Sequence, residues 1–415
     1  MKKLLILFAF SFCLSGAFAQ GTWTSRDTLP DSAMIQGISG FSINGYGYAG
    51  LGENVAGNYE NYFWLFDAST DTWTKKANFP GNIRVAPASF VIGDKAYLVT
   101  GSVKNFGTCV TECWEYDATN NTWTQKANFP GAARTYAVGF AIDSLGYVGT
   151  GANELADFRK DFYAYHPSTN TWTRIADFGG IARSGASGFA VNGKGYVYGG
   201  QDSTIKYYGD MWEYDPIANS WTRKATIPSD DSTSPHLDAS GFAICNNIYL
   251  GSGVDTAYKF SREFWKYNTV SNTWTEEASV PGITKVEGAA FAIGDTGYYG
   301  FGEDSTGSKI INVFDKFYAG DTCNVDAGYS IIKDASEINI YPNPVYQNLY
   351  VRFDEQYSEP ATILIMDITG RIIKSYSVSS YSAPMQIDIS YLTSGMYLIT
   401  MKTKDNSITQ KFIKQ

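Results

Sequence analysis

Four short segments between Ser187 and Arg223 decide the fold: SGFAVN (187–192), KGYVYGG (194–200), DMWEYD (210–215) and SWTR (220–223). Each segment is rich in aromatic and β-branched residues, and turn-forming sequences such as Asn192-Gly193 separate them. The pattern predicts four short antiparallel strands. One sheet of this size cannot bury both of its faces, but several copies packed around an axis can.

The unit recurs along the chain, and its last strand contains a tryptophan at intervals of 50, 50, 49, 49 and 53 residues: Trp23, Trp73, Trp123, Trp172, Trp221 and Trp274. A period of roughly 40 to 50 residues built from strands is typical of propeller blades. The sixth unit stops at 313–318 without a tryptophan strand, whereas Trp23 precedes the first unit. We therefore expect 21–24 to supply the outer strand of the last blade, which closes the ring and removes an exposed edge.

These units resemble the Kelch repeat. The glycine pair after the second strand, the aromatic-x-Tyr-Asp of the third and the Asn-x-Trp of the fourth match the Kelch pattern over residues 22–318. The glycine pair is degenerate in five units, as in Gly149-Thr150-Gly151. The resemblance implies an all-β, six-bladed Kelch-type propeller closed by an N-terminal strand, which we expect to occupy residues 20–319.

The first nineteen residues have the pattern of a secretory signal peptide. Lys2-Lys3 is followed by the apolar run 4–14 and by Ala17-Phe18-Ala19, a small-x-small cleavage site. The apolar run is too short for a membrane helix. We expect residues 1–19 to be removed and the product to carry no transmembrane segment.

The composition changes after the last repeat. Residues 320–335 have the character of a linker, and 336–415 alternate as in a small β-sandwich. This module resembles the type A sorting domain of the type IX secretion system of Bacteroidetes. The residues that carry the resemblance include Pro342, Asn343, Pro344, Asp367, Gly370, Arg371, Gly395, Tyr397, Lys411 and Lys414. The resemblance implies a secreted or cell-surface product and the secretion machinery as a partner; an ordinary carbohydrate-binding or fibronectin-like sandwich is the alternative.

Charge and cysteine content limit the partners. The net charge of −9 argues against a nucleic-acid partner. Cys109 and Cys113 lie in one long loop, where a turn brings them within bonding distance, so we predict a disulfide between them. The alternative, half of a metal site, lacks a nearby histidine or second cysteine pair, and we expect no metal. We expect Cys245 to be a buried small apolar residue rather than a partner of Cys323.

Loops that join the second strand to the third, and the fourth to the next blade, emerge on one side of the ring, here named the loop face. This side is the expected binding surface. Six residues before the aligned inner-strand phenylalanines, the first unit has Ile35 and the other five have a cation: Arg84, Arg134, Arg183, His236 and Lys285. A ring of cations at the channel mouth favours carboxylate or phosphate ligands. In the alternative interpretation these side chains bond carbonyl groups and serve the architecture.

Polar residues follow the glycine pairs on the same face: Asn54, Asn153, Asp202, Asp255 and Asp304. They are candidate contacts for sugar hydroxyls, or else turn residues that satisfy loop backbones. The two histidines lie in different blades, which argues against a copper centre of the galactose-oxidase kind, and we expect no cofactor.

We expect an exported propeller that binds a glycan or a protein through its loop face. No catalytic set is evident in the sequence, which favours binding over catalysis. The alternative is a sugar-modifying enzyme, such as a sialic-acid epimerase or mutarotase, that acts on an acidic sugar in the central channel, because six-bladed Kelch proteins of bacteria include such enzymes.

Overall fold

The computed structural model divides the chain into two compact units, residues 1–323 and 324–415. It describes residues 21–30, 35–54, 56–103, 107–228, 237–255, 257, 259–305, 311–320, 339–341, 345–352, 361–367, 372–378, 385–393, 395–402 and 407–414. Within these ranges, no helix combines the length and the apolar character needed to cross a membrane.

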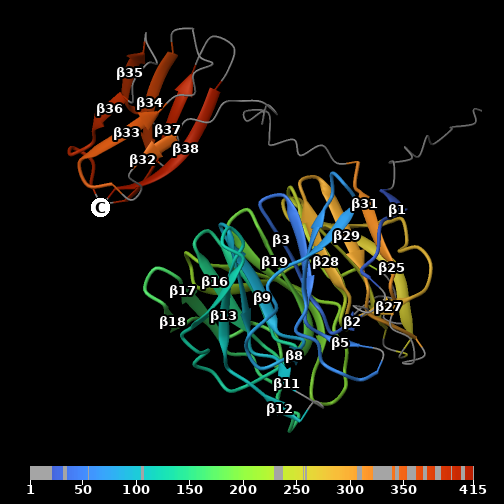
Figure 1. Cartoon of the computed structure of the whole chain (residues 1–415). Helices are drawn as coiled ribbons and strands as arrows, with labels where there is room; N and C mark the ends of the chain where they lie inside the picture. Colours follow the sequence, from blue (N-terminus) through green and yellow to red (C-terminus); the bar gives the residue numbers. More distant parts are fainter. Residues whose placement is uncertain are drawn as a thin grey trace, which may run out of the picture. The chain divides into compact units, whose positions relative to one another are not determined.

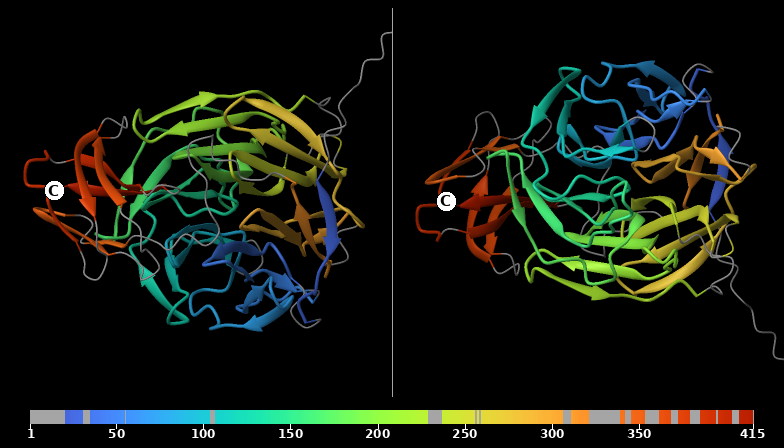
Figure 2. Two further views of the ribbon diagram at one scale, coloured as in Figure 1. Left: turned by 90° about the horizontal axis from the view of Figure 1, so that it is seen from above. Right: turned by 90° about the horizontal axis from the view of Figure 1, so that it is seen from below.

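The first unit is a ring of six four-stranded antiparallel sheets (Figures 1 and 2). Blade 1 consists of β3 (Ser39–Ile43), β4 (Tyr46–Gly50), β6 (Phe63–Asp67) and β7 (Thr72–Lys75). Blade 2 consists of β9 (Ala88–Ile92), β10 (Lys95–Val99), β13 (Cys113–Asp117) and β14 (Thr122–Lys126). Blade 3 consists of β15 (Val138–Ile142), β16 (Leu145–Gly149), β17 (Phe162–His166) and β18 (Thr171–Arg174). Blade 4 consists of β19 (Ser184–Val191), β20 (Lys194–Gln201), β21 (Met211–Asp215) and β22 (Ser220–Arg223). Blade 5 consists of β23 (Ser240–Ile244), β24 (Asn247–Val254), β25 (Phe260–Asn268) and β26 (Thr273–Glu277). Blade 6 consists of β28 (Ala289–Ile293), β29 (Thr296–Gly300), β31 (Phe314–Tyr318) and β1 (Thr22–Ser25).

The ring closes as the sequence predicts. Strand β1 pairs antiparallel with β31, and Trp23 lies opposite Phe317; Figure 2 shows the blue first strand beside the orange last blade. A Cβ on Gly21 would lie 2.1 Å from Phe317, so the chain enters the last blade through a position that accepts only glycine. The innermost strand of each blade contacts those of its two neighbours, and β28 contacts β3, so no inner edge is left open.

The repeated Asn-x-Trp fastens each blade to the one before it. The indole N–H of Trp123 donates to the carbonyl of Ala77 at 3.0 Å, and Trp172 bonds Ala127 in the same way at 2.8 Å. Asn121 adopts a left-handed conformation, accepts the hydroxyl of Tyr116 and bonds the amide of Ala77. Because these bonds link consecutive copies of the sequence unit, each copy of the unit corresponds to one blade of the ring.

The second unit is a β-sandwich. Its sheets are β32 (Asn339–Tyr341), β33 (Asn348–Arg352) and β36 (Met385–Asp388), and β35 (Ile372–Val378), β34 (Ala361–Asp367), β37 (Gly395–Lys402) and β38 (Ser407–Lys414). One buried core takes Leu349, Val351 and Ile387 from the first sheet and Ile363, Ile399 and Phe412 from the second. The all-β prediction for this module is therefore confirmed.

Candidate functional site at the channel throat

Each inner strand has one residue in the left-handed region, with φ between 47° and 66°, two positions before its start or, in blade 4, at its second residue. These six residues occupy equivalent places in the six blades and form what we call the throat ring: Gly37, Ala86, Tyr136, Gly185, Asp238 and Glu287. The residues just before them pair with the chain that follows the second strand, as β2 (Ile35–Gln36) does with β5 (Glu53–Asn54) and β27 (Lys285–Val286) with β30 (Glu303–Asp304). The throat ring therefore lies at the loop-face end of the channel.

Backbone hydrogen bonds connect the throat ring. Five of the six amides donate to the carbonyl of the equivalent residue in the preceding blade: Ala86 to Gly37 (3.1 Å), Tyr136 to Ala86 (3.1 Å), Gly185 to Tyr136 (3.3 Å), Asp238 to Gly185 (3.0 Å) and Gly37 to Glu287 (3.1 Å). Five such links hold the six backbones at fixed separation. The side chains that they carry are consequently held on a rigid frame.

The residue types of the throat ring point to function. Glycine adopts the left-handed conformation without steric cost, whereas other residues are disfavoured there by roughly 1–2 kcal/mol. Gly37 and Gly185 follow this rule, but Ala86, Tyr136, Asp238 and Glu287 do not. Such outliers cluster at active and binding sites, where the surroundings enforce them. Three blades thus place a reactive side chain where glycine would be the stable choice.

These side chains face a cavity of about 240 Å³ that all six blades line. Deeper in the channel the wall consists of small residues, one from each blade: Gly40, Ser89, Gly139, Gly188, Gly241 and Ala290. The backbones approach closely there, because a Cβ on Gly139 would lie 2.5 Å from the carbonyl oxygen of Ser89. Long polar side chains are therefore concentrated at the throat ring.

Tyr136, in blade 3, donates a 2.6 Å hydrogen bond to Oε1 of Glu287, in blade 6 on the opposite side. Burial raises the pKa of Glu287, the bond from Tyr136 lowers it, and the nearby charges of Glu303 and Glu53 raise it. Burial, and then the charge of Glu287, raise the pKa of Asp238 well above its ordinary value. The two carboxyl groups are coupled, so the pair retains a proton to a higher pH than free carboxyl groups would.

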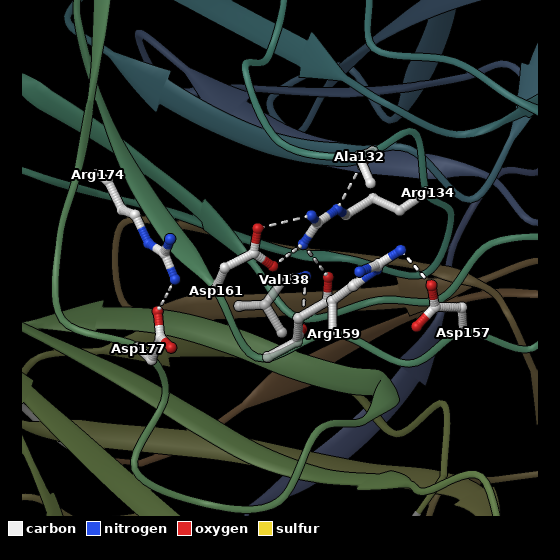
Figure 3. Close-up of polar contacts among 9 residues, drawn as sticks. Ala132, Arg134, Val138, Asp157, Arg159, Asp161, Arg174 and Asp177 are labelled. Carbon is white, nitrogen blue, oxygen red and sulfur yellow. Dashed lines mark hydrogen bonds and ion pairs between the residues drawn. The ribbon is translucent and has the colours of Figure 1, made fainter.

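The predicted cations lie elsewhere. Arg84, Arg134, Arg183 and Lys285 are at most 1% exposed, and none of them lines the throat cavity. Arg134 holds Asp161 through two bonds of 2.7 and 2.9 Å (Figure 3). It also donates to the carbonyl of Thr150 and lies 4.8 Å from the centre of the Phe129 ring. Arg183 pairs in the same way with Asp210, and Arg84 and Lys285 each make one bond, to Glu112 and Asp315. His236 lies outside the described residues.

The polar residues after the glycine pairs organise their own loops. Oδ1 of Asn153 accepts the amides of Leu155 and Asp157, each at 3.0 Å. Asn54, Asp202 and Asp255 accept two backbone amides each in the same arrangement. Asp304 lies in β30 beside Lys285, its register partner. In four blades the turn interpretation accounts for the residue.

The cysteine predictions are wrong. Cys109 and Cys113 are both free and buried. Cys109 belongs to β12 (Thr108–Cys109), which pairs with β11 (Ser102–Val103), whereas Cys113 begins β13 of blade 2, so the two residues lie in different sheets. Cys245 is disulfide-bonded rather than a free apolar residue, and it lies half-buried in the hairpin turn after β23 and not in the strand itself. Cys323 lies outside the described residues.

Some residues of the sorting motif are described. Tyr397 is buried and stacks on Phe412 at 5.7 Å, and its register partner is Asp367. Gly395 pairs with Lys414, and Lys411 is exposed. Pro342, Asn343, Pro344, Gly370 and Arg371 lie outside the described residues.

The sequence interpretation missed Tyr136, Asp238 and Glu287. A signal was present: these residues lie four positions before the aligned phenylalanines, two positions after the cations. To find them, all six units must be aligned and the residue four positions before each phenylalanine must be compared for polar or charged side chains.

Comparisons with known proteins agree with the architecture. Residues 182–228 match the Kelch motif, and residues 339–415 match the secretion system C-terminal sorting domain. No relative was found among the curated proteins. Of 389 matching chains in solved structures, the one titled "Structure of YjhT" has a TM-score of 0.58 and 18% identity, and the match covers 69% of this chain and 95% of that one. This likeness concerns the fold. The chain is a Kelch-motif β-propeller with a C-terminal type IX sorting domain, and it is exported to the cell surface or beyond.

Proposed function

We propose that the exported propeller binds a glycan through its loop face and that a terminal sugar residue enters the throat ring. One observation carries the proposal: Tyr136, Asp238 and Glu287 come from three blades and converge on a single cavity at the loop-face end of the channel. Hydroxyl and carboxyl groups of this kind make the directional hydrogen bonds that distinguish one sugar from another.

The size of the cavity supports a terminal group rather than a long ligand. Drug-sized ligands occupy pockets of roughly 300–1,000 Å³. The throat cavity, at about 240 Å³, is smaller. One sugar ring or one side chain suits this volume, and the rest of the ligand then contacts the surrounding loops. A protein ligand that inserts one side chain is the competing occupant.

A sugar-modifying enzyme is a second candidate because the two carboxyl groups are coupled. General acid–base chemistry needs one group that holds a proton and one that accepts it near the working pH. Burial raises the pKa of both Asp238 and Glu287, the charge of Glu287 raises that of Asp238 further, and Tyr136 bonds Glu287 alone. This asymmetry suits proton transfer to and from a sugar. The carboxyl groups favour a neutral or cationic sugar over an acidic one.

The proposal is tested by a glycan array and calorimetry with the exported chain. We expect Asp238→Asn and Glu287→Gln to lose affinity for any glycan that binds. Asp177→Asn is the matched control, because its carboxylate pairs with Arg174 on the surface (Figure 3). Binding that survives both throat substitutions would move the site away from the channel. Turnover of a bound sugar, abolished by either substitution, would establish the enzyme.

A further inference from the structure

Acidic side chains line the throat cavity without a described basic side chain among them. Among the described residues that line it, Asp238 and Glu287 are the carboxylic acids, and none is lysine, arginine or histidine. Glu53 and Glu303 lie close enough for their charges to act on Glu287. Acidic groups thus come from blades 1, 5 and 6, while Lys285, two positions before Glu287, pairs with Asp315 in its own blade.

A second, independent feature of the cavity is an unused hydroxyl. Ser39 lines the cavity and is 4% exposed, and its Oγ has no hydrogen-bond partner. Ser187 and Ser240 occupy the equivalent position in blades 4 and 5, and their hydroxyls donate to the carbonyls of Ala239 and Gly288 in the next blade. A buried polar atom without a partner costs about 1–3 kcal/mol, so native structures pair such atoms with protein groups, water or a ligand. The Ser39 hydroxyl has no protein partner and is therefore available to an occupant of the cavity.

We infer that the throat ring binds a primary ammonium group carried by the ligand, as on an amino sugar or a lysine side chain. This inference rests on the proposed function and adds that the ligand carries a positive charge. An ammonium has three N–H donors, which the carboxylates of Asp238 and Glu287 and the hydroxyl of Ser39 can accept. The ring of Tyr136 adds an aromatic surface that attracts cations. An anion at this place would face repulsion from every acid around it.

A metal ion is a poorer occupant than an ammonium group. Within the described part of the chain, no three acid, histidine or cysteine side chains are arranged to hold a metal ion. The carboxyl groups of the throat ring come from separate blades on a rigid backbone frame. An ammonium group needs only hydrogen-bond acceptors spread around it, and the throat ring supplies that arrangement.

The acids also give the binding a defined pH dependence. Asp238 faces Glu287, and Glu287 faces Tyr136, Glu303 and Glu53. Tyr136 in turn faces Asp238, Glu287 and Tyr59. Protonated carboxyl groups attract a cation weakly, so affinity for the ammonium group increases as the pH rises through the carboxyl pKa values. A neutral ligand shows no such increase.

The test compares four sugars of similar shape with the exported chain: glucosamine, glucose, N-acetylglucosamine and glucuronic acid. We expect glucosamine to bind at least tenfold more tightly than the other three, with affinity that rises from pH 5 to pH 7. Asp238→Asn and Glu287→Gln should each remove that preference, Ser39→Ala should reduce it, and Asp177→Asn should leave it unchanged. Nα-acetyl-lysine amide in a parallel arm separates a lysine side chain from an amino sugar.

Each result supports or overturns the ammonium site, the glycan function or both. Equal binding of glucose and glucosamine overturns the inference and leaves the proposed glycan function intact. Binding of the lysine probe alone upholds the ammonium site and overturns the glycan. A preference for glucuronic acid overturns the inference, and binding of no probe overturns both. Thermal melting of each variant separates loss of the site from loss of the fold.

Discussion

The Tyr136 hydroxyl and Oε1 of Glu287 lie 2.6 Å apart across the channel, although 151 residues separate them in the sequence. The bond joins blades 3 and 6, which are opposite each other in the ring. It exists only in the closed propeller. The pair therefore reports both on ring closure and on the electrostatics of the throat.

Tyr136→Phe should raise the pKa of Glu287, because the lost hydrogen bond stabilises the charged carboxylate. Carboxyl carbon chemical shifts followed by NMR over a pH titration measure the change. Tyr196→Phe is the control, since Tyr196 donates a similarly short bond of 2.7 Å to Glu213 in blade 4. An unchanged Glu287 titration in Tyr136→Phe would show that the bond does not form in solution.

Asp238→Asn should stabilise the fold increasingly as the pH rises. The folded-state pKa of Asp238 is raised, so the folded chain holds a proton that the unfolded chain releases. This contribution to stability is complete below the ordinary aspartate pKa and is lost as the pH rises through the folded-state value. Asparagine cannot lose a proton and escapes that loss.

Urea unfolding at several pH values measures this effect. The free energy of unfolding of Asp238→Asn should exceed that of the native chain by about 1 kcal/mol at pH 8, the common size of a single-residue effect. The difference should shrink toward pH 4. Asp177→Asn, at an exposed ion pair, should show a difference near zero throughout. A difference in the free energy of unfolding that increases toward low pH would contradict the raised pKa of Asp238.

The fold could be predicted because its determinants are local and repeated. Trp123 and Asn121 bond the preceding blade directly, so the same short motif that appears in the sequence is the contact that sets the blade period. Ring closure could be predicted because Trp23 precedes the first unit and the sixth unit lacks a tryptophan strand, and the pairing of Trp23 with Phe317 confirms the prediction. Hydrophobic pattern and turn chemistry agree at every blade.

The throat ring could not be predicted by the same means. Side chains alternate between faces only in an extended strand, and the left-handed residue two positions after each cation interrupts the alternation. Arg134 therefore faces Asp161 within its own blade, while Tyr136 faces the channel. The throat positions share a conformation, not a residue type, so no motif marks them. Likewise, the short β11–β12 hairpin that separates Cys109 from Cys113 has no strong strand pattern.

Arg134→Ala should destabilise the propeller by about 3 kcal/mol, because it leaves the partly buried carboxylate of Asp161 without its partner. Urea unfolding measures the loss. Calorimetry on the folded fraction should show unchanged affinity for any throat ligand, as the architectural interpretation of the arginines requires. A selective loss of affinity for acidic sugars, with normal stability, would instead support the anion site that the sequence suggested.

Cys245 should form a disulfide with Cys323. Cys245 is bonded, Cys109 and Cys113 are free, and Cys13 lies in the predicted signal peptide, so Cys323 is the remaining cysteine of the mature chain. Mass spectrometry of a non-reducing digest should find one peptide that joins the two residues, and it should disappear on reduction. A native disulfide usually contributes 2–4 kcal/mol, so Cys245→Ser should lower the melting temperature, whereas Cys109→Ser should leave the joined peptide intact. A peptide joining Cys109 to Cys113 would contradict the separation of these residues into different sheets.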